Sequence, residues 1–94
     1  MHLSAIHAEN KAVSAKQLFK GEGTVIALQI ISGQQLKEHL TKIPALLVCV
    51  NGQVIYKDEQ QREVILQSGD YINIEPMVKH WLDAVVDSNL LLVK

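Results

Sequence analysis

The sequence has one cysteine, little net charge and no long apolar run, and each shortage excludes a class of protein. Because Cys49 is the single cysteine among 94 residues, the chain cannot form an intrachain disulfide, which suits a reducing compartment. Nine basic and ten acidic side chains leave a net charge of −1, so bulk electrostatics would hold neither nucleic acid nor an anionic membrane. The longest strictly apolar run, Ala45–Val50, is too short to span a bilayer.

Several motifs of common enzymes are also missing. The chain has no Gly-x-Ser-x-Gly elbow and no Cys-x-x-Cys pair, and its Gly-Glu-Gly turn at 21–23 lacks the lysine of a phosphate-binding loop. Its basic residues are scattered without interleaved aromatics, so no nucleic-acid partner is expected. The first residues carry Glu9 and Lys11 and have no apolar signal-peptide core, so we expect a cytoplasmic location.

What the sequence does contain is a succession of short apolar stretches separated by turn residues. These stretches are Val25–Ile31, Gln35–Leu40, Ala45–Val50, Gln53–Lys57, Arg62–Leu66, Tyr71–Ile74, His80–Val86 and Asn89–Val93. They follow one another too closely for long helices, and this spacing is typical of an all-β sandwich or barrel. We expect one barrel domain over residues 21–94, preceded by an N-terminal edge segment over 1–20. Within that segment, residues 12–19 fit either an edge strand or a short helix.

The pair Asn51-Gly52 predicts a two-residue β-hairpin, because both residues tolerate the positive φ of a type I′ turn. One face of this hairpin would carry Leu47, Cys49, Val54 and Tyr56. The other face would carry Leu46, Val48, Val50 and Ile55, together with Gln53 and Lys57. Since both faces are largely apolar, we expect the barrel interior to cover the first face and a second copy of the chain to cover the other. Coverage by the N-terminal segment is the alternative to such a homodimer.

Two glycine–histidine spacings resemble the motifs of the cupin family, which are small double-sheet β-barrels of jelly-roll type. The first motif matches at Gly33, His39 and Gly52, while Thr41 and Ala45 stand where its second histidine and its glutamate belong. The resemblance implies an all-β double-stranded β-helix, or jelly-roll, barrel.

The second cupin motif matches at Gly69 and His80. Glu75, Met77 and Ala84 stand where this motif has proline, glycine and asparagine, so a changed backbone is expected at Met77. Together the two motifs cover just over half of the chain.

The resemblance implies a metal site of four ligands, of which the sequence supplies two, His39 and His80. A divalent iron, zinc, manganese or nickel ion held by them would need water or substrate to complete its shell. The alternative is a polar pocket without metal. We expect this pocket to be lined by His39, Thr41, Leu47, Cys49, Tyr56, Met77 and His80. Strand alternation would place Lys37 on the same side as His39.

Three functions remain open on this sequence. The first is a barrel of unassigned activity that binds a small molecule, with or without a weakly held metal. The second is a metal-dependent oxygenase or isomerase that uses His39 and His80. The third is a non-catalytic dimeric module with a structural or regulatory role. The fold cannot choose among them, since one fold hosts many functions.

Overall fold

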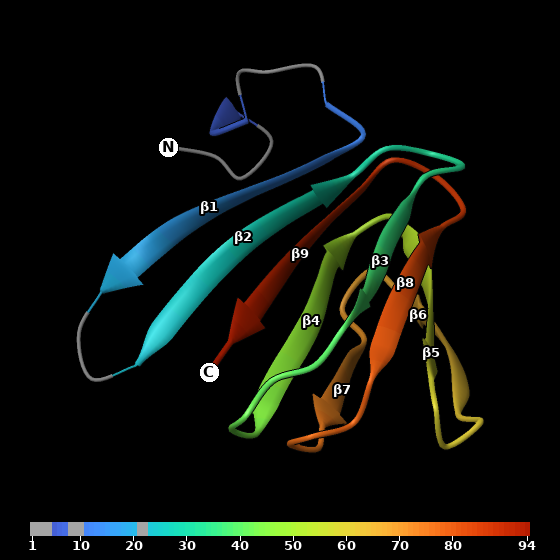
Figure 1. Ribbon diagram of the computed structural model, residues 1–94. Coiled ribbons are helices and arrows are strands. Elements are labelled where there is room, and N and C mark those ends of the chain that lie inside the picture. The colour runs from blue at the N-terminus through green and yellow to red at the C-terminus, as the bar shows by residue number, and fades with distance from the viewer. Residues whose placement is uncertain (1–4, 8–10, 21–22) are drawn as a thin grey trace.

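In the computed structural model, the residues that the structure describes are 5–7, 11–20 and 23–94, and they form nine β-strands (Figure 1). The strands are β1 Val13–Lys20, β2 Thr24–Ile30, β3 Gln35–His39, β4 Ala45–Asn51, β5 Gln53–Asp58, β6 Glu63–Gln67, β7 Tyr71–Ile74, β8 His80–Ala84 and β9 Ser88–Val93. The all-β prediction is therefore confirmed. Within the described ranges, no helix has the length and hydropathy needed to cross a bilayer.

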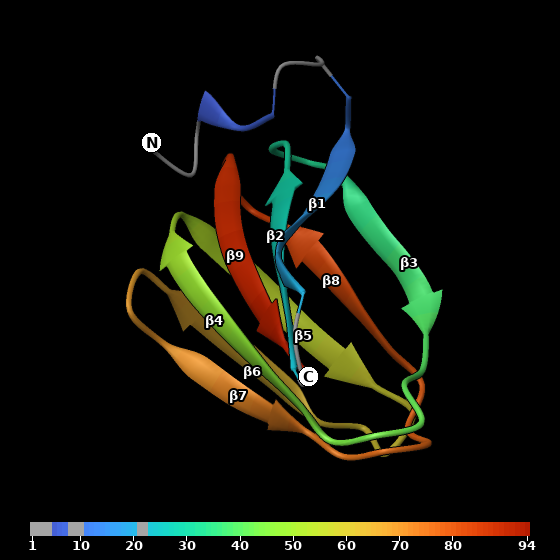
Figure 2. The same ribbon diagram turned by 90° about the vertical axis from the view of Figure 1, so that its left-hand side faces the viewer.

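The strands form two antiparallel sheets that face each other across a common core (Figures 1 and 2). One sheet has the order β1-β2-β9-β4-β7, and the other has the order β3-β8-β5-β6. Among the successive strands, β1–β2 and β5–β6 pair as neighbours, whereas every other connection passes from one sheet to the other. This alternation is the winding of a double-stranded β-helix, the fold that the sequence predicted.

The predicted hairpin at Asn51-Gly52 is wrong. Strand β4 pairs with β7 and β9, so Cys49 lies opposite Leu90 in its own sheet and Val54 belongs to the other sheet. Asn51-Gly52 is instead the corner where the chain leaves the first sheet. Only Gly52 has a positive φ, of 103°, whereas a type I′ turn needs positive φ at both positions. Alternating apolar residues look the same whether two strands pair or face each other across a core.

The inner face predicted for these strands is nevertheless confirmed. The side chains of Leu47, Cys49, Val54 and Tyr56 are all at most 1% exposed and belong to the hydrophobic core. The second face, by contrast, does not exist as one surface. Leu46, Val48 and Val50 point outward from the first sheet, while Ile55 points outward from the second.

Candidate functional site

A pair of histidines lies at one end of the barrel, where β3 ends and β8 begins. His39 and His80 are paired across these strands, and their Nε2 atoms are 3.0 Å apart. The ring centroids are 4.1 Å apart, and the ring planes meet at 63°. His80 is fully buried, whereas His39 is half-buried. The two rings therefore meet, and His39 is the one that solvent reaches.

A bulge in β3 brings His39 to this position. Between Leu36 and His39 the register shifts, because three residues of β3 span the distance of two residues on β8. His39 therefore shares the inner side with Leu36, and Lys37 is exposed. The expectation from strict alternation that Lys37 shares a side with His39 is wrong, because an inserted residue reverses the alternation beyond it.

Backbone carbonyls determine which ring nitrogens carry hydrogen. His80 Nδ1 lies 3.0 Å from the Val78 carbonyl oxygen, and His39 Nδ1 lies 3.2 Å from the Lys37 carbonyl oxygen. A carbonyl only accepts, so each Nδ1–H donates in these contacts. A neutral ring with hydrogen on Nδ1 has its lone pair on Nε2. In that tautomer the two Nε2 lone pairs face each other across 3.0 Å, so the contact is favourable when a proton or another cation is shared between the rings.

Burial lowers the pKa of His80 and so favours its neutral form. The hydrogen bond to the Val78 carbonyl raises the same pKa, the neighbouring His39 lowers it, and the charge of Asp58 raises it. Burial is the largest of these causes. A neutral imidazole with its Nε2 lone pair unprotonated is the form in which histidine binds metals.

A polar network supports His80 from behind. The ring of Tyr56 stacks on His80, with centroids 5.9 Å apart and an angle of 24°. The Tyr56 hydroxyl donates to Asp58 Oδ2 at 3.0 Å, while Asp58 Oδ1 accepts the backbone N–H groups of Gln60 and Arg62 at 2.9 and 3.1 Å. The guanidinium carbon of Arg62 lies 5.5 Å from the centroid of the Tyr56 ring. The network thus holds the aromatic wall against which His80 packs.

Asp58 is the member of this network that the sequence analysis missed. Asp58 is 4% exposed, although it directly precedes the polar residues 59–61. The available signal was an aspartate at the start of a polar turn, a position at which Asp commonly bonds the backbone of an Asx turn, as its Oδ1 does here with Gln60 and Arg62.

The environment of Tyr56 keeps its hydroxyl protonated. Burial, the hydrogen bond to Asp58 and the charge of Asp58 raise the pKa of Tyr56 to about 12. Arg62 lowers this pKa and Glu75 raises it, each to a smaller extent. Tyr56 therefore acts as a permanent donor to Asp58 near neutral pH.

The other residues expected to line the pocket are occupied or packed. Leu47, Cys49 and Tyr56 lie in the hydrophobic core with no exposed surface beyond 1%. Burial, and to a lesser extent the charge of Asp70, raise the pKa of the Cys49 thiol, which is opposite to what a reactive thiolate requires. The buried Thr41 hydroxyl donates to the Ile43 carbonyl at 2.9 Å. The barrel interior is thus filled by its own side chains around these residues.

The residues present could supply two histidine ligands to a metal ion, but they could not supply a full set of protein ligands. Thr41, at the second histidine position, uses its hydroxyl for Ile43, and Ala45, at the glutamate position, has no donor. In the described part of the chain, no group of three or more His, Cys, Asp or Glu side chains could hold a metal ion. His39 and His80, whose Nε2 atoms are 3.0 Å apart, are the residues that would hold such an ion, and its remaining ligands would come from water or a bound molecule.

Met77 belongs to the loop that precedes His80. Its backbone N–H donates to the Thr41 carbonyl at 2.8 Å, and its φ is 65°, in the left-handed region that favours glycine. Met77 stands where the cupin motif has glycine, and here it keeps a conformation suited to glycine. Its side chain is 61% exposed, so packing contributes little to holding it there.

We expect Met77→Gly to stabilise the protein by about 0.5–1 kcal/mol. Relief of the left-handed strain contributes about 1–2 kcal/mol, and the larger conformational freedom of glycine in the unfolded chain offsets part of that gain. Thermal unfolding measures the change. Met77→Ala is the matched control, since it removes the side chain and keeps the strain, and it should give no gain. A Met77→Gly protein that melts no higher than Met77→Ala would contradict the argument.

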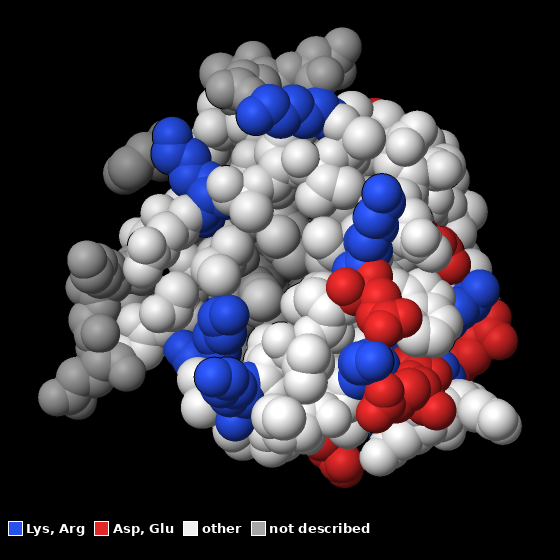
Figure 3. Space-filling model, viewed as in Figure 1, with Lys and Arg blue, Asp and Glu red and all other residues white. Residues whose placement is uncertain are grey.

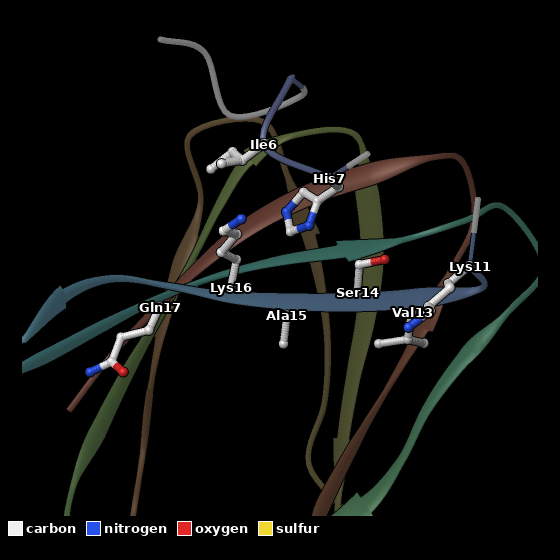
Figure 4. Close-up of a pocket in the computed structure, with 8 residues that line it drawn as sticks. All are labelled: Ile6, His7, Lys11, Val13, Ser14, Ala15, Lys16 and Gln17. Atoms are coloured by element: carbon white, nitrogen blue, oxygen red, sulfur yellow. The ribbon is translucent and has the colours of Figure 1, made fainter. Parts of the chain in front are cut away.

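A separate cavity of about 550 Å³ lies at the N-terminal side of the molecule (Figure 4). Its lining residues are Ile6, His7, Lys11, Val13, Ser14, Ala15, Lys16 and Gln17. Neither histidine of the barrel pair is among them. This cavity borders the edge strand β1 and is distinct from the candidate site.

No family model and no curated protein matches this sequence, so the comparisons with known proteins depend on the fold. A cupin superfamily protein from Desulfitobacterium hafniense matches with a TM-score of 0.86 and 14% identity, covering 98% of this chain and 84% of that one. An RmlC-like cupin with a double-stranded β-helix fold, from Methanocaldococcus jannaschii, matches with a TM-score of 0.79 and 17% identity, covering 93% and 83%. A conserved Streptococcus pyogenes protein of unknown function matches with a TM-score of 0.79 and 20% identity, covering 90% and 75%.

The described residues thus form a double-stranded β-helix with a histidine pair at one end of the barrel. Its fold is that of the small cupin-superfamily domains, as the spacing of the two motifs predicted.

Proposed function

We propose that this chain binds a small molecule with oxygen donors through a divalent transition metal ion that His39 and His80 hold. The observation that carries the proposal is the arrangement of the two rings, with both Nε2 atoms 3.0 Å apart and both Nδ1–H groups directed at backbone carbonyls. Metal-binding histidines commonly donate their other ring N–H to a carbonyl or carboxylate, which fixes the tautomer and the ring orientation.

The incomplete ligand set supports a role for the small molecule. Two imidazoles leave most of the coordination positions of a divalent ion to water or to a bound molecule, and carboxylate or carbonyl oxygens suit these positions. Because Leu47 and Tyr56 fill the interior, such a molecule would bind at the open end of the barrel, beside the half-buried His39. A carboxylate would supply such oxygens together with a negative charge that offsets the charge of the ion.

The metal ion alone is the first probe. We expect isothermal titration of tag-free protein with zinc sulfate to show one site per chain, and thermal unfolding to shift upward as zinc is added. His39→Ala and His80→Ala should each weaken zinc binding by more than about 100-fold, because the loss of an outer-shell partner already costs 10–100-fold. His7→Ala, a histidine from the separate N-terminal cavity, is the matched control and should bind as the unmodified chain does.

Two results would contradict this proposal. One is the absence of zinc binding in folded protein. The cation between the two Nε2 atoms would then be a shared proton. The other is zinc binding that survives in both His39→Ala and His80→Ala. Once zinc binding is established, a melting temperature that rises further with added succinate would support the anionic small molecule.

A further inference from the structure

The cavity at the N-terminal side of the molecule has the size and the charge of a binding site for a small anion. Its volume of about 550 Å³ falls within the range of roughly 300–1,000 Å³ that is common for small-molecule sites. Among the described residues that line it, Lys11, Lys16 and His7 are basic and none is acidic. Such a lining attracts a negatively charged molecule in preference to a neutral one.

Three polar groups of the lining lie on one side of β1. Ser14 and Lys16 are alternate residues of this strand, so their side chains share a face of the sheet. In Figure 4 both point toward the side on which His7 lies, whereas Val13 and Ala15 point the other way. Alternate residues of a strand are about 6.6 Å apart along it, so one small molecule can contact all three polar groups.

Two buried polar atoms in this lining have no hydrogen-bond partner. Across the described ranges, three buried side-chain atoms share this property, namely His7 Nε2, Ser14 Oγ and Asn89 Oδ1. The first two belong to the cavity, and the third lies on the same row of paired residues as Ser14, which continues through Gln29 and Asn89 to Asn51. Native structures seldom leave buried polar groups unpaired, so each such group calls for an explanation. The His7 and Ser14 atoms are available to a bound molecule.

The charge of Lys16 is also available. Lys57 pairs with Asp83 at 3.3 Å and Lys79 pairs with Glu38 at 3.7 Å, whereas Lys16 has no ion-pair partner in the part of the chain that the structure describes. In Figure 3, most of the acidic side chains in view lie on the right-hand side, where Figure 1 places β8, β5 and β6, and basic side chains are in view along β1. The surroundings of the cavity therefore add to its preference for an anion.

We propose that this cavity binds a small organic oxyanion, a molecule with a carboxylate or phosphate group on an apolar body. The Ser14 hydroxyl and a ring nitrogen of His7 can each donate a hydrogen bond to an acceptor oxygen. The Lys16 ammonium group offsets the negative charge, and hydrogen bonds to an ionised group are among the stronger ones. Ile6, which lies on the same side of β1 as His7, supplies apolar surface for the rest of the molecule (Figure 4).

Isothermal titration of the full chain with benzoate and with phenyl phosphate tests the proposal. The protein is first passed over a chelating resin, so that no metal ion at the histidine pair can hold the anion. We expect one site per chain for at least one of the two probes, and the tighter probe identifies the preferred head group. Benzamide, an uncharged molecule with the shape of benzoate, should bind at least about tenfold more weakly than the tighter probe.

Substitutions in the lining locate the site. Lys16→Gln and Ser14→Ala should each weaken binding of the tighter probe by about tenfold or more, because each removes a contact with the ionised group. Lys57→Gln is the matched control, since it removes the same charge from the other sheet, and it should bind as the unmodified chain does. Circular dichroism checks that the variants are folded. Lys16 is exposed and the Ser14 hydroxyl has no hydrogen bond to lose, so both folds should be kept.

Four results would overturn the proposal. The first is folded protein that binds neither anion, and the second is benzamide that binds as tightly as the anions. The third is unchanged binding in both Lys16→Gln and Ser14→Ala. The fourth is a loss in Lys57→Gln as large as that in Lys16→Gln, since net charge alone would then hold the anion. None of these results depends on the metal site proposed at His39 and His80.

Discussion

Gly52→Ala is expected to destabilise the fold by roughly 2–5 kcal/mol, the sum of left-handed strain and overpacking. Gly52 has a φ of 103°, a conformation that side chains other than that of glycine rarely adopt. A Cβ atom here would also overlap the Ser88 hydroxyl and lie 2.7 Å from both the Asp87 carbonyl oxygen and Ser88 Cα. Both effects act at the corner where the chain passes from β4 in one sheet to β5 in the other.

Ser88 cannot move away from such a Cβ atom without breaking other contacts. Its side chain is fully buried, and its hydroxyl accepts the Gln53 N–H at 3.0 Å and donates to the Val86 carbonyl at 2.8 Å. Ser88 also begins β9, which lies between β2 and β4 in the five-stranded sheet. A shift of Ser88 would therefore disturb the connection from β8 to β9 as well as the corner at Gly52.

Thermal and urea unfolding test the Gly52 prediction. For a domain of this size, a loss of 2–5 kcal/mol lowers the melting temperature by roughly 8–40 °C. Gly33→Ala and Gly69→Ala are matched controls, because both glycines have positive φ, of 78° and 92°, but a Cβ atom at either would meet nothing within 4 Å. These controls should lose only the backbone cost of about 1–2 kcal/mol. A Gly52→Ala protein as stable as the controls would show that the corner is not closely packed.

Asp58→Ala is expected to destabilise the protein by about 2–4 kcal/mol, because it removes a buried acceptor and leaves a buried donor unpaired. The carboxylate accepts the Tyr56 hydroxyl at 3.0 Å and the backbone N–H groups of Gln60 and Arg62. Without Asp58, the Tyr56 hydroxyl remains in the core, where Tyr56 has no exposed surface. The loss should exceed that of Tyr56→Phe, because Tyr56→Phe leaves only Asp58 Oδ2 without its donor, whereas Asp58→Ala also removes the acceptor of two backbone N–H groups.

A double-mutant cycle isolates this interaction. In the Asp58→Ala background, Tyr56→Phe should be neutral or stabilising, because it removes a hydroxyl that has already lost its acceptor. Urea unfolding of the four proteins gives the coupling free energy, expected to be about 1–2 kcal/mol. Additive effects would mean that the two side chains stabilise the fold independently, and a loss below about 0.5 kcal/mol for Asp58→Ala would contradict the role of the network.

Much of the site could be predicted from the sequence because motif spacing is preserved where the ligands are not. Gly33, His39, Gly69 and His80 lie in register with two known motifs, and this register indicated that two rings from distant strands would meet. Their Nε2 atoms are indeed 3.0 Å apart. Motif spacing does not show whether the polar side chains near the histidine pair are free to bind a ligand. The Thr41 hydroxyl donates to the Ile43 carbonyl, and the Tyr56 hydroxyl donates to Asp58. Both bonds join residues two positions apart, so they depend on a local backbone conformation that motif spacing does not specify.

The sequence by itself determined the all-β class and the inward side chains of β4 and β5, because period-two alternation is a local property of each regular strand. Only the tertiary structure decided which strands pair. The stretch around Asn51-Gly52 satisfies a hairpin locally, yet closing the barrel places β4 and β5 in opposite sheets, where each gains two partner strands. Closure also divides the apolar outer residues of β4 and β5 between two surfaces, one on each sheet. Sheet pairing depends on the whole chain, and no window of the sequence contains that information.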